Sequence, residues 1–209
     1  MHSTTNNVRK ILQVLESIYP DVKTQLIHKN PFELLIATIL SAQCTDRQVN
    51  KVSGKLFKKL KTPADFANIN IKELEKIIHS TGFYHNKAKN IKNCCIKLIN
   101  DYNSKVPDNI GDLTELPGVG RKTANVVLGV AFNVDSMVVD THVSRISQRL
   151  GLTNNKDSEK IEYDLMKIIP KNKWNNFSLQ LIYFGREFCI SRNPKCIKCP
   201  LTNLCNYKK

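Results

Sequence analysis

Apolar residues recur along most of the chain at the spacing of helices that bury one face. The clearest run has the i, i+3, i+4, i+7, i+8 spacing and consists of Phe32, Leu35, Ile36, Ile39 and Leu40. Shorter runs follow near 74–78, 88–98, 139–150, 161–168 and 174–184. Prolines fall between the runs, where helices begin or end, and only 133–139 resembles a short strand. The pattern predicts an all-α protein.

The charge of the chain is strongly positive. Its 209 residues, enough for one or two domains, include 32 Lys and Arg against 18 Asp and Glu, a net charge of +14. Such an excess favours a polyanionic partner, and nucleic acid first. The chain is also rich in Lys, Asn and Ile, so part of the excess has an alternative source in an AT-rich coding sequence.

Neither secretion nor membrane insertion is expected. The first twenty residues lack the apolar centre of a secretory signal, and every apolar run is shorter than the roughly 18 residues that span a bilayer. The seven cysteines are an odd number, and four of them lie in the last 21 residues. A secreted disulfide framework would be even in number and more dispersed, so the pattern favours a reducing cytoplasm.

The segment Leu-Pro-Gly-Val-Gly-Arg-Lys-Thr-Ala-Asn at 116–125 separates a short helix expected at 110–116 from another at about 121–132. Its glycines permit positive φ and remove side chains from the turn. The N–H groups that begin the second helix can then approach a phosphate. A Walker A loop does not fit, because Arg121 separates Gly120 from Lys122 and Glu115 replaces the required earlier glycine. An ordinary glycine turn between helices is the alternative.

The sequence LPGVGRKTANVVL resembles the helix-hairpin-helix of the endonuclease III family of DNA repair glycosylases. Further motifs follow that family's order at 31–46, 81–91 and 139–146, and the terminal cysteines complete them. The resemblance implies two packed helical domains with a DNA cleft between them. Residues 22–134 would form a six-helix domain that carries the hairpin, about 110–132. Residues 1–21 and 135–209 would form an iron–sulfur domain.

Lys122 and Asp140 match the family's catalytic lysine and aspartate. The positive end of a helix dipole disfavours an ammonium, so a lysine in the first turn of the second helix is unusual for structure alone. That helix is about 18 Å long, and residues 133–139 can span up to about 23 Å. The chain can therefore return Asp140 to the helix start. The alternatives are a phosphate-binding Lys122 and an Asp140 that only caps the helix 141–150.

The resemblance assigns DNA contacts to further residues. In the hairpin these are Gly118, Val119, Gly120, Arg121 and Thr123. By motif position, Gln43 and Phe83 would fill the gap left when a damaged nucleotide is flipped out of the duplex. Phe83 departs from the leucine of the best-known members, which puts the preference for the opposite base in doubt. A core aromatic in a turn is the alternative reading of Phe83.

Four cysteines cluster near the C-terminus with the spacing C-x6-C-x2-C-x5-C: Cys189, Cys196, Cys199 and Cys205. From spacing alone, structural zinc and a [4Fe–4S] cluster are equally good interpretations. The arrangement resembles the family's iron–sulfur loop, which favours the cluster. Lys195 and Lys198 lie between the ligands and suggest a second phosphate-contacting surface. Cys44, Cys94 and Cys95 are interpreted as core residues.

The resemblance as a whole implies a bifunctional DNA glycosylase and abasic-site lyase that removes oxidised pyrimidines from duplex DNA. We expect a monomer that works in the cytoplasm at the nucleoid, with a [4Fe–4S] cluster and damaged duplex DNA as its partner. Two alternatives stay open: a monofunctional adenine-mismatch glycosylase and a non-catalytic DNA-binding module held together by metal. The first lacks an equivalent of Lys122, and Lys122 with Asp140 argues against the second.

Overall fold

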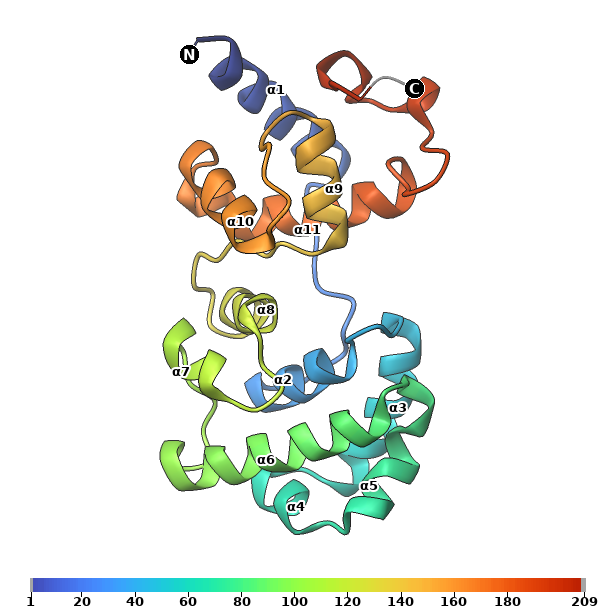
Figure 1. Ribbon diagram of the computed structural model, residues 1–209, viewed down its shortest axis with the longest axis vertical. Coiled ribbons are helices and arrows are strands. Elements are labelled where there is room, and N and C mark those ends of the chain that lie inside the picture. Colours follow the sequence, from blue (N-terminus) through green and yellow to red (C-terminus); the bar gives the residue numbers. More distant parts are fainter. Residues whose placement is uncertain (1, 208–209) are drawn as a thin grey trace. The chain divides into compact units, whose positions relative to one another are not determined.

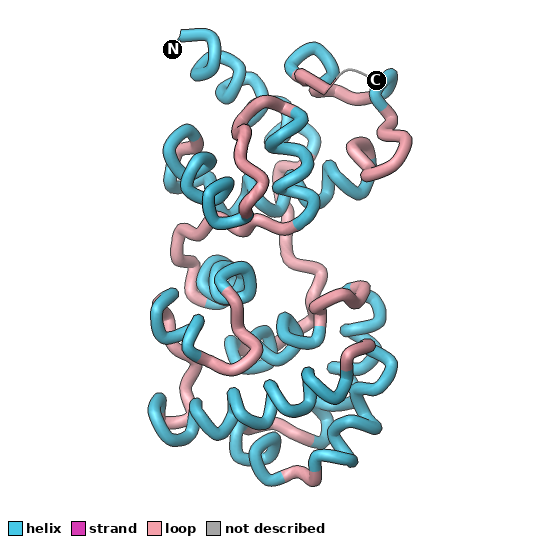
Figure 2. The backbone as a smooth tube through the Cα atoms, viewed as in Figure 1, coloured by secondary structure: helices cyan, strands magenta, loops and turns pink. Residues whose placement is uncertain are grey.

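The computed structural model describes residues 2–207, and within that range it consists of helices and loops without a strand (Figures 1 and 2). The predicted all-α fold is confirmed. Contacts along the chain divide it into two compact units. Unit 1 joins Met1–Lys23 to Asp135–Lys209, and unit 2 is Thr24–Val134.

Unit 2 contains seven α-helices and one 3-10 turn. They are α2 (Pro31–Leu40), α3 (Asp46–Lys59), α4 (Pro63–Asn68), α5 (Ile71–Ile78), η1 (His79–Thr81), α6 (Tyr84–Tyr102), α7 (Ile110–Glu115) and α8 (Arg121–Ala131). The family resemblance implied a six-helix domain at 22–134. The α4 and α7 helices have six residues each, and side-chain caps from Thr62 and Asn109 start them. A short helix was expected where α7 lies, whereas no helical run marked α4.

The core of unit 2 is built around α2. Eight of its ten residues are buried, because α3, α6 and α8 all pack against it. The sequence predicted one buried face, whereas the surrounding helices cover almost the whole circumference. The α4 and α5 helices pack on the long α6 (Figure 1). Cys94 and Cys95 of α6 are fully buried and Cys44 packs against the same core, as predicted.

Unit 1 is assembled from the two ends of the chain. Its helical segments are α1 (His2–Ile18), α9 (Thr141–Arg149), α10 (Ser158–Ile168), η2 (Lys171–Lys173), α11 (Trp174–Glu187), η3 (Cys196–Lys198) and η4 (Thr202–Leu204). The α11 helix packs against both α1 and α9. Apolar residues of α1, α9, α10 and α11 form one core, and it extends to the cysteine segment through Leu201.

The strand-like segment 133–139 is not a strand. No strand lies within residues 2–207 to pair with it, and its backbone finds side-chain partners on α11 instead. The Ser136 N–H donates to Asn175 Oδ1 at 3.0 Å, and the Val138 N–H donates to Ser178 Oγ at 3.0 Å. Helix side chains therefore satisfy an extended backbone that a sheet would otherwise satisfy.

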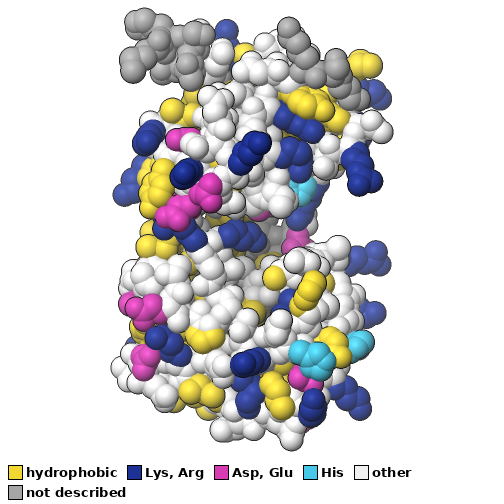
Figure 3. All heavy atoms as spheres, in the orientation of Figure 1, with side chains coloured by type: hydrophobic (Ala, Val, Ile, Leu, Met, Phe, Trp, Pro, Cys, Tyr) yellow, Lys and Arg dark blue, Asp and Glu magenta, His cyan; other side chains and the backbone are white. Residues whose placement is uncertain are grey.

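Basic side chains are spread over the drawn face of each unit, whereas acidic side chains form a few small groups (Figure 3). This distribution follows from the net charge of +14. Within residues 2–207, no helix combines the length and the apolar character needed to cross a membrane.

Candidate active site

The hairpin between α7 and α8 is a tight turn anchored in the core of unit 2. Leu116 and Val119 are buried there, 1% and 4% exposed. The Val119 N–H donates to the Leu116 carbonyl at 3.0 Å, so that N–H is already used within the turn. Gly118 and Gly120 are exposed. Val119 was predicted to contact DNA, but its side chain is not on the surface. Leu116 and Val119 instead anchor the turn in the core, so that the two glycines are exposed.

Gly118 meets two conditions that only glycine satisfies. Its φ is +80°, in the region that side chains disfavour. A Cβ atom at this position would lie 2.8 Å from Cβ of Asn90 on α6, closer than two carbon atoms can pack. The turn therefore lies directly against α6. The glycine is required by this close approach as well as by the backbone conformation.

Replacing Gly118 with alanine is expected to destabilise the protein by about 2 kcal/mol, since positive φ and overpacking each cost about 1 kcal/mol or more. Urea unfolding without DNA measures the change. Gly120→Ala is the matched control, because Gly120 has an ordinary φ of −87° and open space around it. Alanine there should cost only about 0.5 kcal/mol, because glycine is the better N-cap of the two. Equal losses in both variants would contradict the argument.

The first turn of α8 carries Arg121, Lys122 and Thr123. Gly120 is the N-cap, so no side chain caps this turn. The Lys122 side chain is exposed to solvent. An amine in this position is accessible to an incoming ligand, and the N-terminal end of the helix attracts an anion. Both properties suit a group that must meet a phosphodiester chain.

Gln43 and Phe83 are the other predicted DNA-contacting residues of unit 2, and they share an uncommon backbone. Gln43 has φ +52° and Phe83 has φ +49°, although neither is glycine. Gln43 lies in the turn between α2 and α3, and Phe83 is the N-cap of α6. Both side chains are exposed, and Phe83 is 62% exposed. Phe83 is therefore not a core aromatic, and its exposure leaves it available to a ligand.

Asp140 is the N-cap of α9 in unit 1. Its Oδ1 accepts the N–H groups of His142 and Val143, each at 2.8 Å. The capping alternative raised by the sequence is thus real. Capping uses one carboxylate oxygen in both bonds, and the side chain is only half-buried. Asp140 thus belongs to unit 1, whereas Lys122 belongs to unit 2.

His142 and Arg145 connect this cap to the cysteine segment. Arg145 Nη2 donates to His142 Nδ1 at 3.1 Å and to the Cys189 carbonyl at 2.8 Å. A Cβ atom on Gly185 of α11 would lie 2.5 Å from His142 Nδ1, so α9 and α11 approach closely at this point. Burial lowers the pKa of His142, and the nearby Arg145 acts in the same direction. The Asp140 carboxylate opposes both effects. Because a guanidinium can only donate, His142 Nδ1 accepts the bond from Arg145.

Three of the four terminal cysteines act electrostatically on the fourth, Cys199. Burial raises the pKa of the Cys199 thiol, a backbone hydrogen bond from Leu201 opposes this, and the thiols of Cys189, Cys205 and Cys196 raise it further. All four side chains are partly buried. Lys195 and Lys198, which alternate with them, are exposed. The segment thus gathers four soft sulfur donors and presents two basic side chains to solvent.

Arg149 organises the same segment from α9. Its Nη1 donates to Cys189 Sγ at 3.2 Å and to the Ile190 carbonyl at 3.1 Å. Its own carbonyl accepts the Asn206 N–H at 2.9 Å and is 3.3 Å from Cys205 Sγ. The sequence analysis missed both Arg145 and Arg149. Their i, i+4 spacing on one helix was the signal that could have marked a shared basic face.

In the described part of the chain, no group of three or more His, Cys, Asp or Glu side chains has the arrangement that a metal ion requires. Four thiol donors in one loop are nonetheless the ligand set that iron–sulfur clusters use. The donor chemistry and the mutual influence of the sulfurs fit such a group.

Comparisons with known proteins show the family of this chain. The family model of HhH-GPD superfamily base excision DNA repair proteins matches residues 36–171. Endonuclease III of Synechocystis sp. is 48% identical over 206 residues, which cover 98% of this chain and 94% of the relative. This chain belongs to the endonuclease III family. Family membership makes it a base excision repair DNA glycosylase.

Two solved endonuclease III structures are similar to the whole chain. One is a non-covalent endonuclease III–DNA complex, with a TM-score of 0.93 and 48% identity, covering 96% of this chain and 94% of its own. The other is a trapped endonuclease III–DNA covalent intermediate, with the same TM-score and identity, covering 96% and 95%. The similarity includes residues of both units, and it confirms that this chain has the fold of the endonuclease III family.

Proposed function

We propose that this chain is a bifunctional DNA glycosylase and abasic-site lyase that removes oxidised pyrimidines from duplex DNA. The observation that carries the proposal is Lys122, an exposed amine in the first turn of a glycine-capped helix. A similar endonuclease III forms a covalent intermediate with DNA. Lys122 is the group in the hairpin of this chain that is able to form one.

The reaction begins when the Lys122 amine attacks C1′ of the damaged nucleotide. The glycosidic bond breaks, and its electron pair leaves with the base, which takes up a proton. The C1′–O4′ bond then opens as the nitrogen loses a proton, O4′ is protonated, and an imine forms. A proton is removed from C2′, and the electrons of that bond form C2′=C3′ as the C3′–O bond breaks. Water finally hydrolyses the imine and frees the amine.

Asp140 supplies a carboxylate to this chemistry. Positive charge develops on the sugar as the base leaves, and a fixed carboxylate lowers the energy of that state. The two backbone N–H groups that Asp140 accepts at 2.8 Å hold the side chain in one orientation. The cap therefore prepares the carboxylate for catalysis and does not compete with it.

The damaged nucleotide must leave the base stack before Lys122 can reach it. Gln43 and Phe83 are the side chains that we assign to the space it vacates, because both are exposed on short turns. The phenyl ring of Phe83 can stack on neighbouring bases without reading their sequence. A glycosylase of this kind selects a lesion by how readily it is extruded and how well it fits.

Cys189, Cys196, Cys199 and Cys205 would hold a [4Fe–4S] cluster. Bound there, the cluster supplies structural cross-linking of four points of one loop. Arg149 holds the loop through the Cys189 sulfur and the Ile190 carbonyl, which fixes the direction in which Lys195 and Lys198 project. Those two lysines then contact phosphates. A chromosomal substrate places the enzyme at the nucleoid in the cytoplasm, where one copy of the chain suffices.

Products from a duplex with one ring-saturated, oxidised thymine test the proposal. The wild type is expected to release the base and to cut the strand 3′ to the lesion. A mismatch glycosylase without lyase activity would leave an uncut abasic site. A DNA-binding module would bind the duplex and leave it unchanged. Gel electrophoresis with and without later alkali treatment separates the three outcomes.

Removing the two loop lysines should reduce the salt dependence of DNA binding. Each phosphate contact contributes about 0.9 to the slope of log K against log salt concentration, so Lys195→Ala with Lys198→Ala should lower that slope by about 2. Fluorescence anisotropy at several salt concentrations measures it. The control pair, Lys72→Ala with Lys76→Ala, removes the same charge from exposed positions on α5. Equal slopes for both pairs would exclude a special role for the loop.

A further inference from the structure

Lys87 is a lysine in the core of unit 2. It lies in the first turn of α6 and is 5% exposed. Its ammonium group donates to the Leu40 carbonyl and to the Thr81 carbonyl, each at 2.8 Å. Burial lowers the pKa of Lys87, and the Cys44 thiol acts in the opposite direction. Burying a lysine is costly without partners, so these two bonds account for its presence.

The two carbonyls that Lys87 joins lie just before the two proposed gap-filling residues. Leu40 is the last residue of α2, three positions before Gln43. Thr81 is the last residue of η1, two positions before Phe83. The two partners are therefore 41 residues apart in sequence, and one ammonium group holds both. The backbone N–H of Lys87 also donates to the Phe83 carbonyl at 3.0 Å.

Both segments have backbones that need external support. Gln43 and Phe83 have positive φ, which is unfavourable for residues with a side chain and persists when the surroundings hold it. The Leu40 carbonyl is among the last four of α2, which lack partners within a helix. A cation is also the favourable charge at that helix end. Lys87 satisfies the carbonyl and fixes the position of the turn that follows.

We propose that Lys87 is a positioning residue that holds the Gln43 turn and the Phe83 turn in one fixed spacing for entry into DNA. The inference rests on the proposed roles of Gln43 and Phe83. Its consequence is specific, because a fixed spacing matters only when two side chains must enter a duplex together. Misplacing a positioned group by about 1 Å can cost about 100-fold in rate. Chemistry on a nucleotide that is already outside the stack has no such requirement.

The test compares one lesion in two contexts, paired in a duplex and unpaired in a single-nucleotide bulge. Single-turnover base release is measured for each, and the ratio of the two rates reports extrusion. Lys87→Met keeps an unbranched side chain only one atom shorter and removes its donors. We expect it to lower the rate on the paired lesion at least about tenfold relative to the bulge. Lys87→Arg, which keeps the charge and the donors, should restore part of the ratio.

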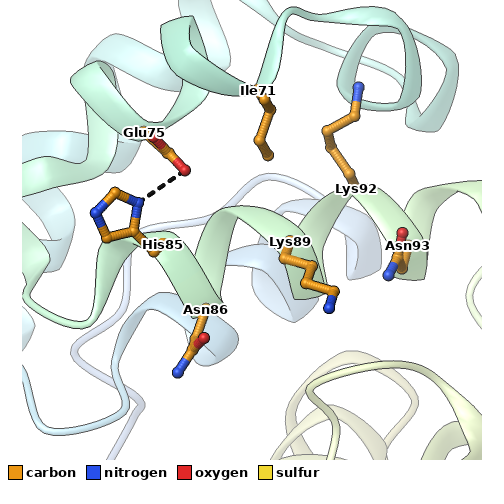
Figure 4. A pocket seen from close by; sticks show the side chains of 7 residues that line it. All are labelled: Ile71, Glu75, His85, Asn86, Lys89, Lys92 and Asn93. Atoms are coloured by element: carbon orange, nitrogen blue, oxygen red, sulfur yellow. Dashed lines mark hydrogen bonds and ion pairs between the residues drawn. The ribbon is translucent and has the colours of Figure 1, made fainter.

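Lys92 provides the matched control. It lies on the same helix, and its ammonium group also donates to two carbonyls, those of Ala67 and Ile69, each at 2.6 Å. Figure 4 shows the Lys92 side chain beside the α5–α6 pocket, directed away from Lys89 and Asn86. Its partners lie at the end of α4, and neither lies directly before Gln43 or Phe83 in the chain. Lys92→Met should therefore leave the ratio of paired to bulged rates unchanged.

A double-mutant cycle separates this inference from the proposed function. Phe83→Ala should lower the ratio by itself. Lys87→Met should then lower it less than it does in the wild type, because only the Gln43 turn is left for Lys87 to hold. No effect of Phe83→Ala or Gln43→Ala would overturn the proposed gap-filling roles. An effect of these two variants with an unchanged ratio in folded Lys87→Met would overturn the role of Lys87 alone. If Lys87→Met does not fold, Lys87→Gln, which keeps donors on a shorter chain, decides by the same ratio.

Discussion

Borohydride is expected to trap the wild-type protein covalently on a duplex that carries one abasic site, and Lys122→Ala should form no such adduct. The reductant converts the imine between Lys122 Nζ and C1′ into a stable amine. No imine can form without that nitrogen, so the loss should exceed about 1000-fold, as expected when the nucleophile of a covalent mechanism is removed. Denaturing gel electrophoresis of labelled DNA shows the adduct directly.

Lys122→Arg is the control that distinguishes a nucleophile from a phosphate-binding cation. Arginine retains the charge and binds phosphate well, but its guanidinium does not form this imine. We expect near-normal DNA affinity without an adduct. Lys122 is exposed, so both substitutions should change the free energy of unfolding by less than about 0.5 kcal/mol. An undiminished adduct in either variant would assign the chemistry to another residue.

The sequence could predict what depends on neighbouring residues. Helical spacing is local, and the all-α fold followed from it. The hairpin could also be predicted, because its helices and glycines lie within about twenty residues. Where the signal was shorter than two helical turns, prediction was weaker. No helical run marked the six-residue helix α4, and 133–139 resembled a strand although α11 side chains satisfy its backbone.

The contacts of Lys87 and Arg149 could not be predicted from the sequence, because most of their partners are distant in the chain. The two carbonyls that Lys87 binds are 47 and 6 residues away, and Arg149 reaches Cys189 across 40 residues. A lysine in a helical run looks like any solvated lysine until the fold surrounds it. The proposed catalytic residues lie in recognisable motifs, whereas Lys87 and Arg149 do not. A catalytic role requires a particular type of residue, which the sequence shows. A positioning role requires a contact, which only the folded structure shows.

Asp140→Asn should lower the rate of base release by at least about 100-fold while leaving the protein folded. The substitution removes the negative charge that stabilises the developing positive charge on the sugar, and removing one such electrostatic group costs about 100- to 1000-fold. Asparagine is as good an N-cap as aspartate, so the bonds to the His142 and Val143 N–H groups can persist. Single-turnover kinetics and urea unfolding, measured together, report charge and cap separately.

Asp157 supplies the comparison that makes this result decisive. It is the N-cap of α10 in the same unit, and its Oδ1 accepts the N–H groups of Glu159 and Lys160 at 3.1 and 3.0 Å. Asp157→Ala should lose about 1 kcal/mol of stability, the usual value of a cap, with no change in rate. Asp140→Ala should lose both. If Asp140→Asn kept the wild-type rate, Asp140 would be a cap alone, and the carboxylate that assists Lys122 would have to be another residue.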